Sequence, residues 1–250
     1  MHEVPAVKPL SDLSVKLFAD GADKAAMLEL YSEPHIKGFT TNPTLMRKAG
    51  ITDYERFARD ILEHITDLPI SFEVFVDDFE EMYTQARQIA SWGDNVFVKI
   101  PITNTEGEPA YPVIRRLSNA GVKVNVTAVM TSEQVAGTVR ALNGGARACV
   151  SVFAGRIADT GRDPLPLMKE AVDMLSANPG LELIWASPRE LLNVFQADAI
   201  GCHIITATRD ILAKLKLIGK DLAGYSLETV KMFHEDAAAS GFSLYSSASA

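Results

Sequence analysis

Short apolar runs alternate with longer amphipathic stretches along most of this 250-residue chain. The first apolar run, VKLFADG at 15–21, precedes ADKAAMLELYSE, and the last, CHIITAT at 202–208, precedes RDILAKLKLIG. The other apolar runs lie at 38–42, 70–76, 95–102, 122–129, 148–155 and 181–187. Continuous apolar runs are typical of parallel strands buried on both faces, and the stretches between them have helical periodicity. The pattern predicts about eight strand–helix pairs, the number in a (β/α)8 TIM barrel.

A doubly wound open sheet is the competing architecture. It usually has fewer strands, and its dinucleotide-binding members carry a GxGxxG fingerprint after the first strand. Here the first strand is followed by ADGADKAA, which lacks that fingerprint, and no linker or low-complexity segment divides the chain. We therefore expect an α/β fold with a single TIM-barrel domain over 1–250, an extra C-terminal helix, and loose termini at 1–14 and 242–250.

The composition limits the classes of partner. A net charge of −8 argues against nucleic acid as the main partner, although a few arginines could still create a local site for a small anion. No apolar run approaches the ~18 residues that a membrane span needs, and the N-terminus does not resemble a secretory signal. The sequence thus predicts a cytoplasmic protein that acts on a small molecule.

Neither cysteines nor histidines show the spacing of a metal site. Cys149 and Cys202 both lie in apolar runs and are interpreted as reduced core residues. The five histidines are scattered along the chain. We expect no metal and no cofactor.

Lys99 interrupts the apolar run NVFVKIPIT at 95–103. An unpaired ammonium in the interior costs several kcal/mol, and one relief is loss of the proton, which leaves an amine able to attack a carbonyl. The structural alternative is a lysine at a strand end whose stem is packed and whose amine lies in solvent.

Polar residues recur at the predicted carboxyl ends of the strands, where TIM barrels carry their sites. In chain order they are Asp20, Thr41, Asn42, Glu73, Lys99, Asn125, Thr127, Ser151, Arg156, Ser187, Arg189, Thr206 and Thr208. Several have structural alternatives: Asp20 or Asn42 could cap a helix, Asn125 and Thr127 could form a polar pair in the core, and Arg156 could lie on the surface. Taken together, a lysine, two carboxylates and arginines are typical of carbon–carbon bond chemistry on a sugar phosphate.

The chain resembles the transaldolases, specifically the short branch of class I Schiff-base enzymes that also contains fructose-6-phosphate aldolases. The resemblance runs from about residue 15 to about residue 220. The segments that carry it are LFADGAD, GFTTNPTLM at 38–46, FEVFVD, VFVKIPIT, VNVTAVMT at 124–131, SVFAGRIADTG at 151–161 and WASPRE at 185–190.

This resemblance implies a role for each position. Lys99 would form a Schiff base with the C2 carbonyl of a ketose donor, and Asp20 would take the C4 hydroxyl proton as the C3–C4 bond breaks. Glu73 and Thr127 would hold a catalytic water. Substrate contacts are implied for Thr41, Asn42, Asn125, Ser151 and Phe153, and a phosphate site for Arg156, Ser187 and Arg189.

Two positions favour transfer of the three-carbon unit to an acceptor over aldol cleavage that releases it. The aldolases of this branch carry glutamine and tyrosine where this chain has Glu73 and Phe153. The resemblance therefore implies a transaldolase that moves a dihydroxyacetone unit between sugar phosphates, as in the pentose phosphate pathway, and that works as a homo-oligomer.

The alternatives that stay open are a fructose-6-phosphate aldolase, a transaldolase for a modified sugar such as a sulfonated one, and a non-catalytic sugar-phosphate-binding barrel. The extended PITNTEGEPAYP loop and Pro188 depart from the family pattern and leave the bound anion open.

Overall fold

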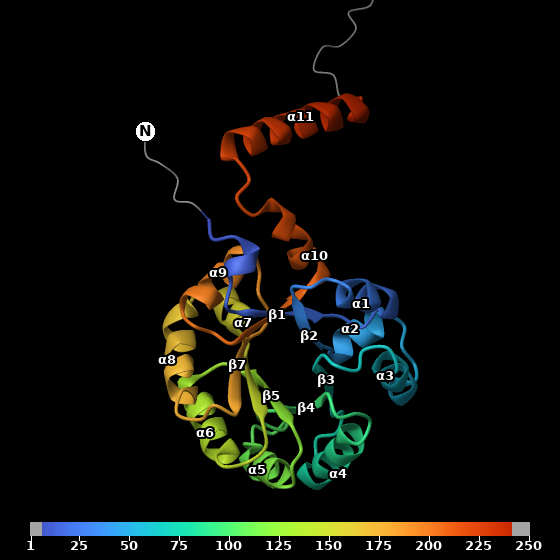
Figure 1. The fold of residues 1–250 in the computed structure, drawn as a ribbon, viewed down its shortest axis with the longest axis vertical. Coiled ribbons are helices and arrows are strands. Elements are labelled where there is room, and N and C mark those ends of the chain that lie inside the picture. Colours follow the sequence, from blue (N-terminus) through green and yellow to red (C-terminus); the bar gives the residue numbers. More distant parts are fainter. Residues whose placement is uncertain (1–6, 242–250) are drawn as a thin grey trace, which may run out of the picture.

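Eight parallel strands close into a barrel in the computed structural model, which describes residues 7–241 (Figure 1). The strands are β1 (Lys16–Asp20), β2 (Ile36–Thr40), β3 (Ile70–Glu73), β4 (Val96–Pro101), β5 (Val124–Val129), β6 (Ala148–Val152), β7 (Leu181–Trp185) and β8 (Ile204–Thr208). Each strand pairs with its neighbours in the sequence, and β8 pairs with β1 to close the barrel. The predicted TIM barrel is confirmed.

The helices of the described chain mostly surround the barrel, and several begin where a side chain satisfies the free amides of the first turn. They are α1 (Lys24–Tyr31), α2 (Pro43–Lys48), α3 (Tyr54–Leu62), α4 (Phe79–Ala90), α5 (Tyr111–Asn119), α6 (Ser132–Leu142), α7 (Ala154–Asp159), α8 (Leu165–Leu175), α9 (Leu192–Ala199), α10 (Arg209–Leu212) and α11 (Leu222–Ser240). Asp23, Asp53 and Asp78 cap α1, α3 and α4, and Thr131 forms a capping box with Gln134 in α6. Local sequence thus sets where each of these helices begins.

Several elements differ from the sequence prediction; for example, the strand expected at 38–42 is β2 at Ile36–Thr40. The run at 70–76 is a strand only as far as Glu73, and the run at 148–155 turns into the short helix α7 after Val152. The single helix expected over 209–219 is α10 followed by the 3₁₀ segment Ala213–Leu217. The apolar runs extend past the strands because the loops and first helical turns also contribute buried residues, such as Val74 and Ala154.

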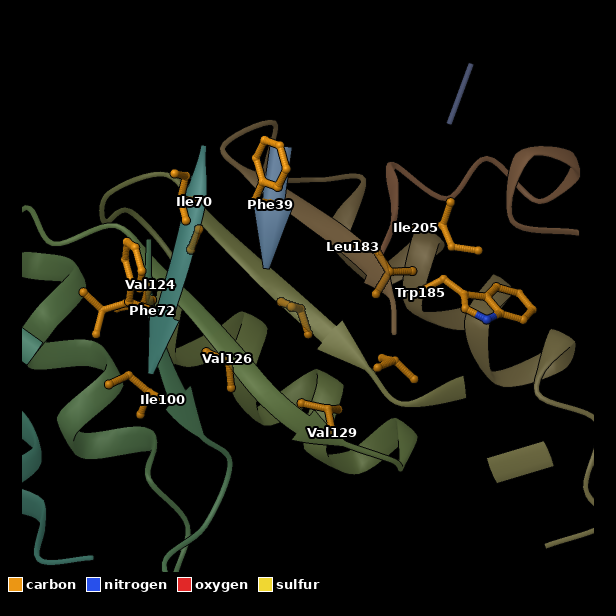
Figure 2. Close-up of a cluster of buried hydrophobic side chains, with 14 of the residues drawn as sticks. Phe39, Ile70, Phe72, Ile100, Val124, Val126, Val129, Leu183, Trp185 and Ile205 are labelled. Atoms are coloured by element: carbon orange, nitrogen blue, oxygen red, sulfur yellow. The ribbon is translucent and has the colours of Figure 1, made fainter. Parts of the chain in front are cut away.

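Two layers of apolar side chains hold the barrel together. Side chains on the outer face of the strands pack under the helices, and Figure 2 shows them pointing away from the strands. The labelled members are Phe39, Ile70, Phe72, Ile100, Val124, Val126, Val129, Leu183, Trp185 and Ile205. A smaller cluster, which contains Phe18, Phe97, Cys149, Ile184, Ala186 and Ile204, forms separately on the alternate strand residues. Since side chains alternate across a strand, these residues fill the barrel interior below the polar ends.

Gly38 makes room for the Phe18 ring inside this layer. A Cβ atom at position 38 would lie 2.5 Å from the Phe18 Cζ atom, and the two residues are register partners on β2 and β1. Such an approach is far inside normal van der Waals contact, so a residue without a side chain is needed there.

The two ends of the described chain differ in how they contact the barrel. Residues 8–14, part of the segment expected to be loose, contain the 3₁₀ turn Leu10–Asp12, and Lys8 Nζ and Ser14 N–H both donate to the Asp198 carboxylate. In contrast, α11 lies apart from the barrel in Figure 1 and none of its residues is buried. Residues 1–6 and 242–250, which include the whole segment FSLYSSASA expected to be loose, lie outside the described part of the chain.

Candidate active site

Lys99 is buried and paired at the carboxyl end of β4. Its side chain has 8% of its surface exposed, and its Nζ atom lies 3.1 Å from Glu73 Oε2. The same nitrogen donates to the Thr41 carbonyl oxygen at 2.7 Å. Glu73 and Lys99 are register partners on adjacent strands, which brings the two side chains together. These contacts exclude the alternative in which the amine of Lys99 lies in solvent.

Asp20 lies at the end of β1 and accepts two side-chain hydrogen bonds. Thr40 Oγ1 donates to Oδ1 at 2.8 Å, and Asn42 Nδ2 donates to Oδ2 at 3.2 Å. Thr40 in turn shares a 2.6 Å hydrogen bond with the buried hydroxyl of Thr206 on β8. Burial raises the pKa of Asp20, while the nearby Lys99 and the bonds from Thr40 and Asn42 oppose that rise. The balance leaves a carboxyl group that takes up a proton more readily than usual.

Helix capping, the structural alternative for Asp20 and Asn42, is found for Asn42 but not for Asp20. Asp23, not Asp20, caps α1. Asn42 does cap α2, because its Oδ1 atom accepts from Leu45 N–H at 2.9 Å, yet its amide nitrogen also binds Asp20. One residue therefore fixes both the start of a helix and the orientation of the carboxylate.

Asn125 joins β3, β5 and β6 through a buried chain of hydrogen bonds. Its Nδ2 atom donates to Ser71 Oγ at 3.0 Å, and its Oδ1 atom accepts from Ser151 Oγ at 2.7 Å. The structural alternative in which Asn125 pairs with Thr127 is not present, because Thr127 Oγ1 is buried without a hydrogen-bond partner among the described residues. A buried hydroxyl without a protein partner is costly unless water or a ligand binds it.

The residues expected at the anion site lie on the loops after β6 and β7. Arg156, on α7, places its guanidinium carbon 5.7 Å from the centroid of the half-buried Phe153 ring. Arg189 is held by Asp159 through two hydrogen bonds, one of them from Nε to Oδ1 at 3.0 Å and the other from Nη2 to Oδ2. Both arginines are exposed at the rim of the barrel and do not belong to the group of buried polar residues around Lys99.

Gly155, in the first turn of α7, lies directly against the loop that follows β7. A Cβ atom at position 155 would lie 1.5 Å from the Ser187 carbonyl oxygen and 3.2 Å from Arg189 Nε. Ser187 itself has a φ angle of +58°, a strained value for a residue other than glycine. The close approach sets the start of α7, which carries Arg156, directly against the loop that carries Ser187 and Arg189.

The structure adds site residues that the sequence prediction missed. Thr40 and Ser71 bond the predicted residues Asp20 and Asn125, and a period of two along their strands would have indicated that they face the interior with Asn42 and Glu73. Thr206, a polar residue at the end of the predicted eighth strand, shares a hydrogen bond with Thr40. Tyr54 on α3 bonds the backbone of Glu73, and Asp159 binds Arg189. No pattern in the sequence indicates the last two.

Within residues 7–241, no group of three or more histidine, cysteine or carboxylate side chains could hold a metal ion. None of the helices in that range has the length and apolar character needed to cross a bilayer.

Fold and site together define a (β/α)8-barrel protein whose polar centre is a buried lysine paired with a carboxylate. Residues 17–245 match the family described as Transaldolase/Fructose-6-phosphate aldolase, and the chain belongs to that family. It is therefore a transaldolase-like enzyme.

Curated relatives agree with this assignment. A "Probable transaldolase" of Streptococcus equi subsp. zooepidemicus is 38% identical over 204 residues, which cover 80% of this chain and 90% of the relative. A "Probable transaldolase" of Methanococcus maripaludis is 36% identical over 202 residues, with 80% and 89% covered. Among solved structures, KGPDC from Streptococcus mutans superposes with a TM-score of 0.55 at 13% identity, covering 83% of this chain and 99% of that one. At that identity the likeness shows the barrel fold alone.

Proposed function

We propose that this chain is a transaldolase, which moves a dihydroxyacetone unit from a ketose phosphate to an aldose phosphate through a Schiff base on Lys99. The observation that carries the proposal is the placement of a buried lysine amine 3.1 Å from the Glu73 carboxylate, in the same barrel mouth as Asp20. These are the three groups that covalent carbonyl chemistry needs: a nucleophile, a proton acceptor beside it, and a second carboxylate for the reacting hydroxyl.

The covalent step begins at Lys99. Its amine adds to the C2 carbonyl of the donor, and loss of water from the resulting carbinolamine gives an iminium ion. Asp20 then removes the proton of the C4 hydroxyl, the C3–C4 bond breaks, and its electron pair moves toward the iminium nitrogen to give an enamine. The C4 fragment leaves as an aldehyde. The enamine then adds to an acceptor aldehyde, whose carbonyl oxygen takes up the proton held by Asp20, and hydrolysis of the new iminium ion completes the transfer and frees Lys99.

Glu73 and Thr127 would bind the water molecule that is released when the iminium ion forms and consumed when it is hydrolysed. Glu73 is the acid in contact with Lys99, and Thr127 lies in register with Pro101, two residues beyond Lys99 on β4. Thr127 Oγ1 has no hydrogen-bond partner among the described residues, although it is buried. A water between the two side chains would satisfy that hydroxyl and supply the proton transfers at C2.

Substrate contacts follow from the remaining polar atoms of the mouth. Asn42, Asn125 and Ser151 present amide and hydroxyl groups suited to the hydroxyls of the dihydroxyacetone unit, and Thr41 holds the lysine through its carbonyl oxygen. Arg156, Ser187 and Arg189 lie together at the rim and suit the anionic end of the sugar. A phosphate is the anion we propose, and a sulfonate is the alternative.

Transfer is favoured over aldol cleavage by two side chains. Glu73 is an acid rather than an amide, and Phe153 has no hydroxyl with which to bring a proton to the enamine. Slow protonation would let the enamine survive until an acceptor arrives. The second candidate function is a fructose-6-phosphate aldolase, which would release the three-carbon unit without an acceptor.

Borohydride reduction in the presence of fructose 6-phosphate tests the proposal. We expect a reduced three-carbon adduct, located at Lys99 by intact mass and peptide mapping, and no adduct in Lys99→Met. Lys123→Met is the matched control, since the Lys123 amine binds the Asp94 carbonyl oxygen near the opposite end of the barrel. A folded wild-type protein that forms no adduct with any ketose phosphate tested would contradict the proposal.

A homo-oligomer in the cytoplasm is also part of the proposal. Large apolar side chains remain exposed on α11, including Leu222 at 64% and Phe233 at 62%. None of the 19 residues of α11 is buried, and exposed large apolar side chains of this kind are typical of a surface covered by another copy of the chain. The mass of the full chain in light scattering, compared with that of Phe233→Glu, tests this assembly.

The buried free cysteines, Cys149 and Cys202, are typical of a reducing compartment.

A further inference from the structure

The edge of β3 that faces β2 loses its strand partner before Glu73. β2 and β3 pair only through Phe39 with Ile70 and Thr40 with Ser71. The last backbone hydrogen bond on this side runs from Thr41 N–H to the Ser71 carbonyl oxygen at 3.2 Å, after which the chain enters α2. Because backbone groups alternate between the two sides of a strand, those of Glu73 face the same side as those of Ser71 and find no strand there.

The Tyr54 hydroxyl takes the place of the missing strand. It accepts a hydrogen bond from Glu73 N–H at 2.7 Å and donates one to the Glu73 carbonyl oxygen at 3.1 Å. A phenol has one proton to donate and lone pairs to accept with, so these two bonds use both of its functions. On the other side of β3, Val74 N–H donates to the Lys99 carbonyl oxygen at 3.2 Å. The backbone around Glu73 is thus held from both sides.

The Tyr54 ring is itself fixed in place. It makes edge-to-face contacts with Phe75, Trp92 and Phe72, at centroid distances of 4.4, 5.5 and 6.1 Å. Tyr54 is also the first residue of α3, whose start is capped by Asp53. Burial raises the pKa of Tyr54, so the phenol keeps the proton that it donates to Glu73. The hydroxyl is therefore presented to β3 by a rigid aromatic cluster and not by a mobile side chain.

We propose that Tyr54 is a positioning residue for the reaction: by completing the backbone hydrogen bonding of Glu73, it keeps the Glu73 carboxylate 3.1 Å from the Lys99 amine. This inference rests on the proposed function, in which Glu73 exchanges protons beside Lys99. Glu73 is the last residue of a four-residue strand, so without the Tyr54 hydroxyl its backbone would be free to shift on the β2 side. A displacement of about 1 Å costs up to about a hundredfold in rate where groups must be aligned.

Tyr54→Phe tests the inference, since it removes the hydroxyl and keeps the ring. We expect kcat for transfer from fructose 6-phosphate to fall at least about tenfold, with KM changed by less than about twofold. Tyr31→Phe is the matched control, because the Tyr31 hydroxyl donates to Asp67 Oδ1 at 2.6 Å on the surface away from the site. Its kcat and KM should both stay near wild type, and its melting temperature should fall less than that of Tyr54→Phe, because the Tyr31 hydroxyl bond is exposed whereas loss of the Tyr54 hydroxyl leaves two backbone groups of Glu73 unpaired.

The split between kcat and KM separates positioning from direct contact with the substrate. Tyr54 also lines a pocket of about 380 Å³ with Met46, Ile51 and Phe75, so a role as a pocket wall is the rival explanation. A rise in KM at unchanged kcat would overturn the inference in favour of that role. An unchanged kcat and KM, with a lowered melting temperature, would overturn it in favour of a structural role alone.

A double-mutant cycle tests whether Tyr54 acts through Glu73. In the Glu73→Gln background the carboxylate to be positioned is absent, so adding Tyr54→Phe should lower kcat by less than about twofold. A further tenfold loss in the double variant would show an effect independent of the carboxylate and would overturn the inference.

A measurement without substrate keeps this test distinct from the test of the proposed function. Wild type, Tyr54→Phe and Tyr31→Phe are labelled with trinitrobenzenesulfonate, and the rate at Lys99 is read by peptide mapping. We expect Lys99 to react several-fold faster in Tyr54→Phe alone, because a displaced carboxylate no longer covers the amine. Equal rates would overturn the positioning inference. An absent borohydride adduct in wild type would instead reject the proposed function.

Discussion

Glu73 and Lys99 face each other across the β3–β4 pair as register partners, with Oε2 and Nζ 3.1 Å apart. The Thr41 carbonyl oxygen accepts a second hydrogen bond from the same amine at 2.7 Å. A buried ammonium needs such partners, because an unpaired charge in the interior costs several kcal/mol. The arrangement shows how one charged residue is accommodated in an otherwise apolar strand: its neighbours on β3 and after β2 supply the compensating oxygens.

Thr40→Val is expected to move the acid limb of the pH–rate profile to higher pH. The hydrogen bond from Thr40 stabilises the ionised form of Asp20 and lowers its pKa against the effect of burial. Removing that donor leaves burial less opposed, so the pKa of Asp20 rises further and the active carboxylate is lost at a higher pH. The measurement is kcat against pH for Thr40→Val and for Thr84→Val, an exposed control whose hydroxyl binds the Glu80 carbonyl oxygen. Coincident profiles would contradict the role of Thr40.

Asp20→Asn is expected to stabilise the folded chain near neutral pH while it abolishes transfer. The pKa of Asp20 is raised above its ordinary value of 3.8, so ionising this carboxyl costs more in the folded than in the unfolded state. The stability of the wild type therefore falls as pH rises through the interval between the two pKa values. We expect Asp20→Asn to have a higher Tm than wild type at pH 7.

The gain from Asp20→Asn should shrink as pH is lowered through that interval, because Asp20 in the wild type then becomes protonated. Calorimetry at several pH values checks this. A loss of stability at pH 7 that grows smaller in acid would give the opposite sign and contradict the prediction.

Glu73→Gln combined with Phe153→Tyr is expected to raise acceptor-independent cleavage of fructose 6-phosphate by at least about tenfold, a difference of about 1.4 kcal/mol in the barrier. The tyrosine would place a hydroxyl beside the barrel interior, where Phe153 packs, and the glutamine would remove the charge that faces Lys99. Release of glyceraldehyde 3-phosphate without an acceptor is the readout. An unchanged ratio of cleavage to transfer would show that these two side chains do not decide between the reactions.

Arg189→Ala is expected to raise KM for phosphorylated sugars by about tenfold or more, since a charge-assisted hydrogen bond contributes ~1.5–3 kcal/mol. Binding of unphosphorylated dihydroxyacetone should change little. Arg59→Ala is the matched control, because Arg59 is also exposed and paired with an acid, Glu55 on α3. An equal loss of affinity for both kinds of ligand would contradict the assignment of Arg189 to the anion.

Gly38→Ala is expected to destabilise the barrel by about 1–3 kcal/mol, because the added Cβ atom would meet the Phe18 ring at 2.5 Å. Gly21→Ala is the control, since no atom lies within 4 Å of the corresponding position. Urea unfolding measures both. Adding Phe18→Leu to Gly38→Ala should recover part of the loss, and a double variant less stable than Gly38→Ala would show that the clash is not the cause.

The strand order and most of the polar residues of the candidate active site could be predicted from the sequence. Buried parallel strands require apolar runs, and an acid or a lysine inside such a run, as at Glu73 and Lys99, is too costly to occur there by chance. Asp20 and Asn42 were found because they follow their strands directly. The family pattern then gave each of these residues an expected role, and residues 17–245 match that family.

The contacts that orient these groups depended on tertiary structure. Tyr54 lies 19 residues before Glu73 in a helix, and only the early end of β2 brings its hydroxyl to the strand. Asp159 and Arg189, 30 residues apart, meet because Gly155 lets α7 approach the loop that follows β7. Thr206 reaches Thr40 only when β8 closes against β1. Burial can be recognised in the local sequence as a periodicity of apolar residues. The pairing of polar atoms depends instead on strand register and barrel closure, which no single segment encodes.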